Sequence, residues 1–267
     1  MRREPASGVA LACALSLALA AALAAPAAAK IDEAEWLLES ASPDDAERAA
    51  KLLEARAAET PDRFEARFGA ARALTQVMAI RTNGNLPLVD GLQDDDANRA
   101  LWADLGARAL AHARAAHALR PESVEAAAAL ASSYMFYASS LGIIRSIVSG
   151  AGGEYRTHAQ RVVDLDAVFD DAVGHALLAS FYLVAPWPVG DRDQSLAHFE
   201  RAAALAPGSV RNQYGLGVFW ARDGDAARAR PHFERARALP CTPHTERLFC
   251  DWMKQTSAEA LAALGTD

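Results

Sequence analysis

Histidines, cysteines and clustered acids, the residues that most often carry chemistry, lack a catalytic or metal-binding spacing in this sequence. No two of the seven histidines are four residues apart, as the metalloprotease pattern H-E-x-x-H requires. The run Asp94-Asp95-Asp96 resembles the start of a calcium loop, but Arg99 and Leu105 stand where glycine and glutamate are required. Nucleophile-elbow, P-loop and dinucleotide-binding motifs do not occur. We therefore predict no enzyme, no metal and no cofactor.

The stretch APWPVGD at residues 185–191 is the strongest candidate for a binding element. Pro186 and Pro188 cannot continue a helix, so they end one and open a loop. Trp187 stands between them, where a rigid aromatic side chain has few structural duties. It either lines a pocket or partner surface, or covers the top of a helix hairpin.

Three further residues complete the predicted binding face. Arg145 lies in the apolar stretch LGIIRSIVSG and is the charged candidate beside Trp187, with a solvated arginine as the alternative. Tyr137 and Tyr182 stand near expected helix ends next to the same stretches. Aromatic side chains at such places often contact a ligand or a partner.

The elements that must position these residues are helices. The sequence is 52% hydrophobic, with alanine as a large part of that share, and only 7% aromatic. Alanine favours helices and close helix contacts, and alternating runs of Val, Ile and Thr are nearly absent. We predict an all-α fold.

A repeat resembling the tetratricopeptide repeat organises these helices. The pattern A-x3-F-x2-A-x4-P of its second helix occurs around Phe199 and returns 34 residues later around Phe233. Leu216-Gly217 matches the first helix between them, where a small residue lets two helices cross closely. The expected fold is an array of helical hairpins, an α-solenoid. The anchor positions of the second helices are Leu53, Ala113, Ala159, Phe199 and Phe233.

Anchor spacings longer than 34 residues indicate long inserted loops within the hairpins. We expect them at 80–98, 139–153 and 184–193. Because matching turns of a helical array lie along one edge, these loops should gather on one face, which repeat proteins often use for binding. At the other end of the chain, Thr256 and Glu259 form a capping box that predicts a C-terminal capping helix.

The N-terminal segment is typical of a secretory signal. A basic start precedes the apolar run VALACALSLALAAALAA, and Ala27 and Ala29 occupy the small-residue positions of a cleavage site. We expect a signal peptide at 1–29, a single helical-repeat domain at 30–267, and a periplasmic location. An uncleaved membrane anchor is the alternative.

The charge and the cysteines bear on partners and compartment. The net charge is −7 and becomes −8 without the signal, which carries two arginines and one glutamate. This balance disfavours nucleic acid and anionic membrane surfaces as partners. In an oxidising periplasm Cys241 and Cys250 either pair or remain buried thiols, and their spacing alone does not decide.

The segment HALLASFYLVAPWPVGDRDQSLAHFERAAALAP, residues 175–207, resembles the T component (TatT-like) of TRAP transporters. These are periplasmic proteins with tetratricopeptide-like repeats. The likeness rests on a Pro-Trp-Pro turn followed by Gly190-Asp191 and a repeat helix, and it extends over roughly residues 65–240. No lipobox is present, although relatives are often lipoproteins.

The resemblance implies a non-enzymatic accessory protein of a TRAP-type uptake system. Such a protein would dock a periplasmic solute-binding protein and hold a small hydrophobic ligand. Apart from the resemblance, we expect that the chain can form a homo-oligomer. The alternative is a general envelope scaffold for protein–protein interaction, which binds along its concave surface. Changes at Trp187, Arg145 or Tyr137 should impair the accessory protein, whereas changes at Asn212 and Gln213 should impair the scaffold.

Overall fold

The computed structural model describes residues 33–82, 95–241 and 248–265, and every regular element in those ranges is a helix. The predicted signal peptide, 1–29, and residues 83–94 of the expected 80–98 loop lie outside the described residues. Within the described ranges, none of the helices combines the length and the apolarity needed to cross a bilayer.

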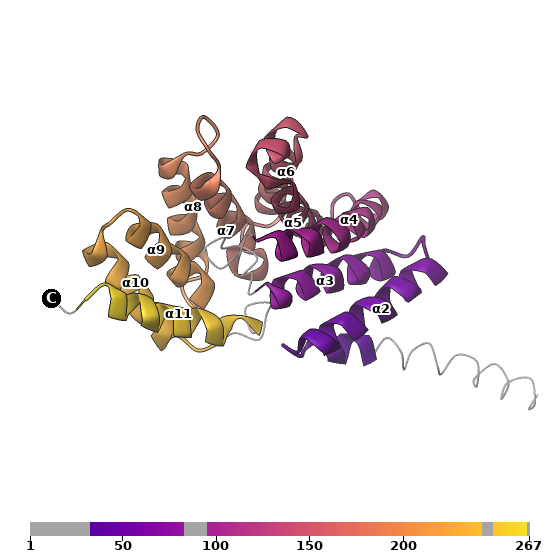
Figure 1. Ribbon diagram of the computed structural model, residues 1–267, viewed down its shortest axis with the longest axis horizontal. Coiled ribbons are helices and arrows are strands. Elements are labelled where there is room, and N and C mark those ends of the chain that lie inside the picture. Colours follow the sequence, from indigo (N-terminus) through magenta and orange to yellow (C-terminus); the bar gives the residue numbers. More distant parts are fainter. Residues whose placement is uncertain (1–32, 83–94, 242–247, 266–267) are drawn as a thin grey trace, which may run out of the picture.

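The helices follow one another along the chain as antiparallel hairpins, and each packs against its neighbours in sequence (Figure 1). A short helical segment, 33–38, precedes them. The helices of the hairpins and the closing helix are α2 (Pro43–Glu59), α3 (Phe64–Arg81), α4 (Asp96–Leu119), α5 (Val124–Val148), α6 (Ala151–Leu165), α7 (Phe169–Val184), α8 (Arg192–Leu205), α9 (Val210–Arg222), α10 (Ala226–Ala238) and α11 (Cys250–Ala263).

The predicted repeat register is confirmed, because its anchors are buried on alternate helices, α2, α4, α6, α8 and α10. Local sequence also explains where several helices begin. A serine or aspartate side chain accepts a hydrogen bond from the backbone N–H three residues later, which satisfies one of the free donors of the first turn. The residues that do so are Ser42, Asp95, Ser123, Asp191, Ser209 and Asp225.

Two details of the sequence prediction are wrong. Residues 139–153 are not a long loop: α5 runs on to Val148, and only a tight turn separates it from α6. The capping helix exists, but α11 begins at Cys250 rather than at Thr256. Its Ser257 hydroxyl bonds back to the Met253 carbonyl inside the continuous helix. At Gly142 the chain kinks without ending α5, and at Thr256 the local capping signal lies inside a continuous helix.

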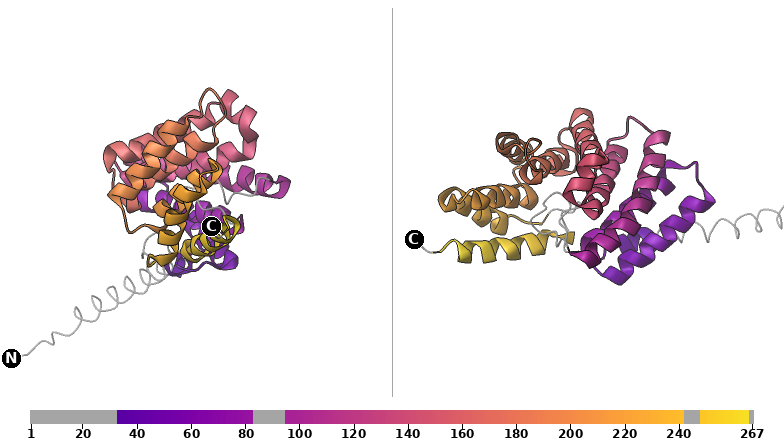
Figure 2. Two further views of the ribbon diagram at one scale, coloured as in Figure 1. Left: turned by 90° about the vertical axis from the view of Figure 1, so that its left-hand side faces the viewer. Right: turned by 45° about the horizontal axis from the view of Figure 1, so that its top comes forward.

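The hydrophobic core divides into two main clusters that meet at α7. One cluster runs from the segment 33–38 to Leu177, Leu178 and Phe181, and the other runs from Ala179 to Met253 on α11. Figure 2 shows α11 lying along the end of the array beside α9 and α10. The central helix α7 is therefore buried on nearly all sides and joins the two halves of the protein.

The start of α7 has an unusual backbone. Asp170, Asp171 and Ala172 all have positive φ, between 46° and 63°, in the left-handed region that side-chain-bearing residues rarely adopt. The side chain of Arg211 on α9, 3% exposed, donates hydrogen bonds to the carbonyls of Asp170 and Asp171. Asn212 donates to the Asp171 carbonyl over 2.9 Å and to the Ala202 carbonyl. Contacts from α9 thus hold this turn in place.

Cys241 and Cys250 form a disulfide. Cys241 follows the end of α10, and Cys250 is the first residue of α11, where it is fully buried. The bond ties the closing helix to the last repeat. The open alternative of two buried thiols is therefore not what the structure contains.

Candidate binding site

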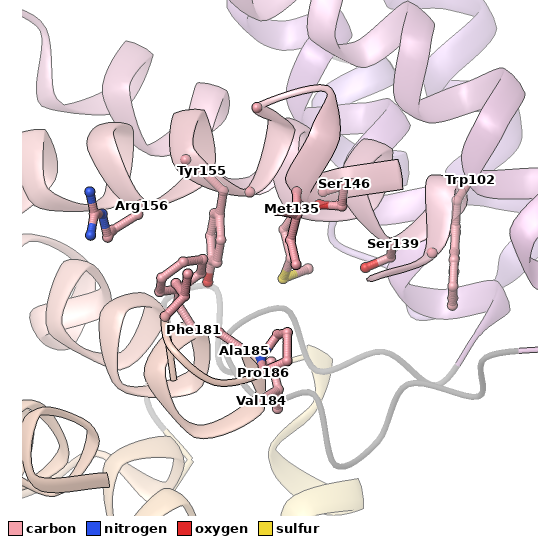
Figure 3. A pocket seen from close by; sticks show the side chains of 17 residues that line it. Trp102, Met135, Ser139, Ser146, Tyr155, Arg156, Phe181, Val184, Ala185 and Pro186 are labelled. Carbon is pink, nitrogen blue, oxygen red and sulfur yellow. The ribbon is translucent and has the colours of Figure 1, made fainter. Parts of the chain in front are cut away.

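A cavity of about 520 Å³ lies where α5, α6 and α7 meet, beneath the loop that follows α7. Figure 3 shows Ser139 and Ser146 on the α5 side, Tyr155 on α6, and Phe181 and Val184 on the α7 side. The wall is mainly apolar, with Met135 among its lining residues. A cavity of this size and character is typical of small-molecule sites.

Glycines make room for the cavity. Gly142, Gly150, Gly152 and Gly153 all line it. Gly142 has non-helical dihedrals, φ 71° and ψ 168°, so α5 is kinked there. Gly150 is left-handed at φ 77° and is the N-cap residue that precedes α6. A Cβ atom on Gly152 would point between the Ser146 hydroxyl, 3.3 Å away, and the Phe181 ring, 3.9 Å away.

The Tyr155 hydroxyl is not available to a ligand. It donates a hydrogen bond to the Leu177 carbonyl over 2.8 Å, and burial raises the pKa of this phenol. Tyr155 therefore contributes its ring to the wall and fixes α6 to α7. The hydroxyls of Ser139 and Ser146 are the small polar groups of the lining.

Exposed apolar side chains lie on two segments, 144–148 and 184–189, that also supply residues of the cavity lining. Trp187 is 90% exposed and Val148 is 84% exposed. Ile144, one turn before Val148 on α5, is also exposed. Ile147, Val184 and Val189 are exposed at one side and line the cavity at the other. These six residues form what we call the apolar rim.

The loop of residues 185–191 positions two of these six residues, Trp187 and Val189. A Cβ atom on Gly190 would lie 2.0 Å from the Ala185 carbonyl oxygen, so only glycine fits there. Asp191 caps α8 through a bond from the Gln194 N–H, and this bond is the first cause of its lowered pKa. The Asp191 N–H donates to the Tyr182 carbonyl. The Gly-Asp pair of the motif therefore fixes the loop to the end of α7.

The predicted site residues are only partly brought together. Pro186 lines the cavity, whereas Trp187 and Pro188, joined by a cis peptide bond, are not among its lining residues. With most of its surface in solvent, Trp187 does not cover a hairpin. Arg145 is exposed on α5 outside the lining.

The two predicted tyrosines act inside the packing. Tyr137 packs partly buried against the core, and its backbone lies 3.3 Å from the Cβ position of Gly106. Tyr182 stacks on His198, with ring centroids 5.9 Å apart. Neither is among the residues that line the cavity.

Sequence reasoning missed most of the lining, including Met135, Tyr155 and Phe181. These residues follow the ordinary packing pattern of the repeat, so their types alone do not distinguish them. The signal that could have located the cavity is the group of glycines between 142 and 153. In the described residues, no group of three or more potential metal ligands is present.

Comparisons agree with this architecture. The crystal structure of TTC0263, a thermophilic tetratricopeptide repeat protein of Thermus thermophilus, is similar with a TM-score of 0.62. The match is 14% identical in sequence and covers 87% of this chain and 99% of that chain. The present chain is a tetratricopeptide-like helical repeat protein. Because the identity is only 14%, this similarity establishes the fold of the present chain and does not establish its function.

The crystal structure of yeast Tom70 also matches the present chain, with a TM-score of 0.32 and 14% identity. The match covers 81% of this chain and 59% of Tom70. No protein-family model matches the sequence. No curated protein matches it either.

Proposed function

We propose that this chain is a non-enzymatic periplasmic accessory protein that docks another protein on the apolar rim and holds a small apolar ligand in the cavity beneath it. The observation that carries the proposal is that six exposed apolar side chains lie on the two segments, 144–148 and 184–189, that also supply lining residues of one cavity. Contiguous apolar patches on soluble proteins usually mark interaction sites, because exposing them to water is unfavourable.

The narrower form of the proposal names the partner as the solute-binding protein of a TRAP-type uptake system. It is supported by the resemblance of the segment 175–207 to T components and by the place of its Pro-Trp-Pro turn on the rim. The alternative, a general envelope scaffold, is supported by the fold alone, since helical-repeat arrays commonly bind other proteins. The two differ in whether one kind of partner or many engage the rim.

The first test addresses the ligand. The chain without residues 1–29 should enhance the fluorescence of the apolar dye N-phenyl-1-naphthylamine, and Gly152→Leu should weaken dye binding at least tenfold. The reason is that a side chain at 152 enters the cavity between Ser146 and Phe181. Tenfold corresponds to about 1.4 kcal/mol.

Gly208→Leu is the matched control, because Gly208 lies in an exposed turn between α8 and α9 with open space around its Cβ position. It should bind the dye as the unsubstituted protein does. Equal dye binding by the Gly152 and Gly208 variants, or none by the unsubstituted protein, would contradict ligand binding in this cavity.

The second test addresses the partner. A photo-crosslinking amino acid at position 187, and separately at position 148, should capture the same periplasmic solute-binding protein in cells, identified by mass spectrometry. Both positions lie on the apolar rim and are largely exposed. A tryptophan hot spot at an interface typically contributes about 2 kcal/mol or more, so Trp187→Ala should strongly reduce copurification of that partner.

Val168 provides the control position, since it is also an exposed apolar residue but precedes α7 at the end opposite the rim. It should not capture the solute-binding protein. Capture of varied envelope proteins from 187 and 148 would favour the general scaffold. Identical capture from all three positions would exclude a docking role for the rim.

A further inference from the structure

A pair of histidines joins α7 to α8 behind the cavity wall. The Nδ1 atoms of His175 and His198 lie 2.9 Å apart, and His175 is only 8% exposed. A hydrogen bond between two imidazole nitrogens needs one N–H donor and one lone pair. At least one ring must therefore be neutral at Nδ1, and a doubly protonated pair would set two N–H donors against each other.

The surroundings of this pair disfavour protonation of either imidazole ring. Burial is the main cause that lowers the pKa of His175 to about 4, followed by the charges of His198 and Arg201. Burial also lowers the pKa of His198. The next helix on one side, α6, presents Val162 and Val163 to α7 at Gly174, and both are apolar.

Two further charged groups on α8 and α9 have other partners. On the α9 side, Arg211 lies 3.7 Å from the Asp170 carboxylate at the start of α7. The charge of Glu200 on α8 raises the pKa of His232 on α10, but burial is the larger cause and lowers this pKa overall. No carboxylate is among the causes acting on His175 or His198. Burial and the nearby positive charges thus oppose protonation of the pair.

Ring contacts lead from the histidine pair to the cavity. His198 stacks on Tyr182, and Tyr182 meets Phe181 edge-on with ring centroids 5.4 Å apart. Phe181 lines the cavity. The Tyr182 carbonyl also accepts the bond from Asp191 that holds the loop of the rim. A separation of α8 from α7 would therefore disturb both the wall and the loop.

We propose that the His175–His198 pair is a pH-sensitive latch, and that its protonation loosens the α7–α8 hairpin and weakens binding at the cavity. The effect on binding rests on the proposed function, whereas the loosening of the hairpin does not.

The direction of the pH dependence follows from linkage. An exposed histidine has a pKa of about 6.5, above the values in the closed hairpin, so the open state takes up protons first as the pH falls. The closed hairpin has its full stability above about pH 6.5. It loses stability as the pH falls from there towards the pKa of His175, about 4.

Hydrogen exchange with mass spectrometry on the chain without residues 1–29 tests the latch, with rates corrected for intrinsic exchange. Between pH 7.5 and pH 5, amides of α7 and α8 should lose at least tenfold protection relative to those of α3 and α4. His175→Leu, which keeps the site apolar and cannot be protonated, should abolish this loss. His198→Phe, whose ring can still stack on Tyr182, should reduce it and serves if His175→Leu does not fold.

His232→Gln is the matched control, because His232 also precedes a repeat anchor and is half-buried, but on α10. It should keep the pH response of α7 and α8. Uniform protection at both pH values, an equal loss in all helices, or an unchanged pH response in whichever histidine variant folds would overturn the latch.

Binding of N-phenyl-1-naphthylamine should also weaken at pH 5 in the unsubstituted protein but not in His175→Leu. Pocket binding that does not change with pH would overturn the coupling, while absence of dye binding at pH 7.5 would contradict the proposed function alone.

Discussion

Arg211→Ala is expected to lower the free energy of unfolding by about 3–5 kcal/mol, the usual result of removing one partner from a buried, charged network. The substitution leaves the carbonyls of Asp170 and Asp171 without their arginine donor. It also removes the positive charge that lies 3.7 Å from the Asp170 carboxylate. The left-handed turn from 170 to 172 then lacks these contacts, which hold it in place. Urea unfolding followed by circular dichroism measures the loss.

The control for this prediction is Arg235→Ala. Arg235 also donates to a backbone carbonyl, that of Pro207, but it is exposed and its removal should cost no more than about 0.5 kcal/mol. Arg211→Lys should remain destabilised, because an ammonium cannot reproduce the planar fork of the guanidinium. Similar unfolding midpoints for Arg211→Ala and Arg235→Ala would show that α9 does not hold the start of α7.

Gly217→Val is expected to cost about 3 kcal/mol, the upper part of the range for overpacking a core. A Cβ atom at Gly217 on α9 would lie 2.6 Å from two atoms of the Phe233 ring. Phe233 is buried on α10 and packs against Tyr214, so it has little freedom to move away. The same unfolding measurement applies. Adding Phe233→Ala should cost less in the Gly217→Val background than alone, because the two sites are in contact.

Gly153→Val is the matched control, since Gly153 is also a helical glycine but has open space around its Cβ position. Its effect should stay within about 0.5 kcal/mol. A cost as large as that of Gly217→Val would mean that the loss reflects a β-branched residue in a helix rather than contact between α9 and α10.

Part of this architecture follows from residue spacing. The repeat pattern around Phe199 and Phe233 correctly predicted an all-α array of hairpins and the alternation of first and second helices. It succeeded because the helical period sets which side chains share a face, and small residues such as Gly217 determine where helices can touch. The capping box at Thr256 and Glu259 correctly indicated a closing helix, but a local signal of this kind misplaced its start, which is at Cys250.

Other parts depended on contacts between distant residues. Asn212 and Gln213 were expected on the concave binding surface, yet both are buried, and Asn212 is 0% exposed. Asn212 donates a hydrogen bond to the Asp171 carbonyl at the start of α7, and the Gln213 side chain is hydrogen-bonded to His232 on α10. Since each of these two bonds joins residues on different helices, 19 or more positions apart, local spacing could not distinguish ligand-facing from packing polar residues.

The candidate site shows the same division. Proline at 186 and 188 required a helix end, because proline lacks the N–H and clashes with the preceding turn. Whether Gly142 would end α5 or only kink it, and whether Trp187 would face the cavity or the solvent, depended on how α5, α6 and α7 pack together. Local residue types thus set the helices and their breaks. The cavity, its rim and the histidine pair arise only from long-range packing, which brings together residues that no short-range pattern relates.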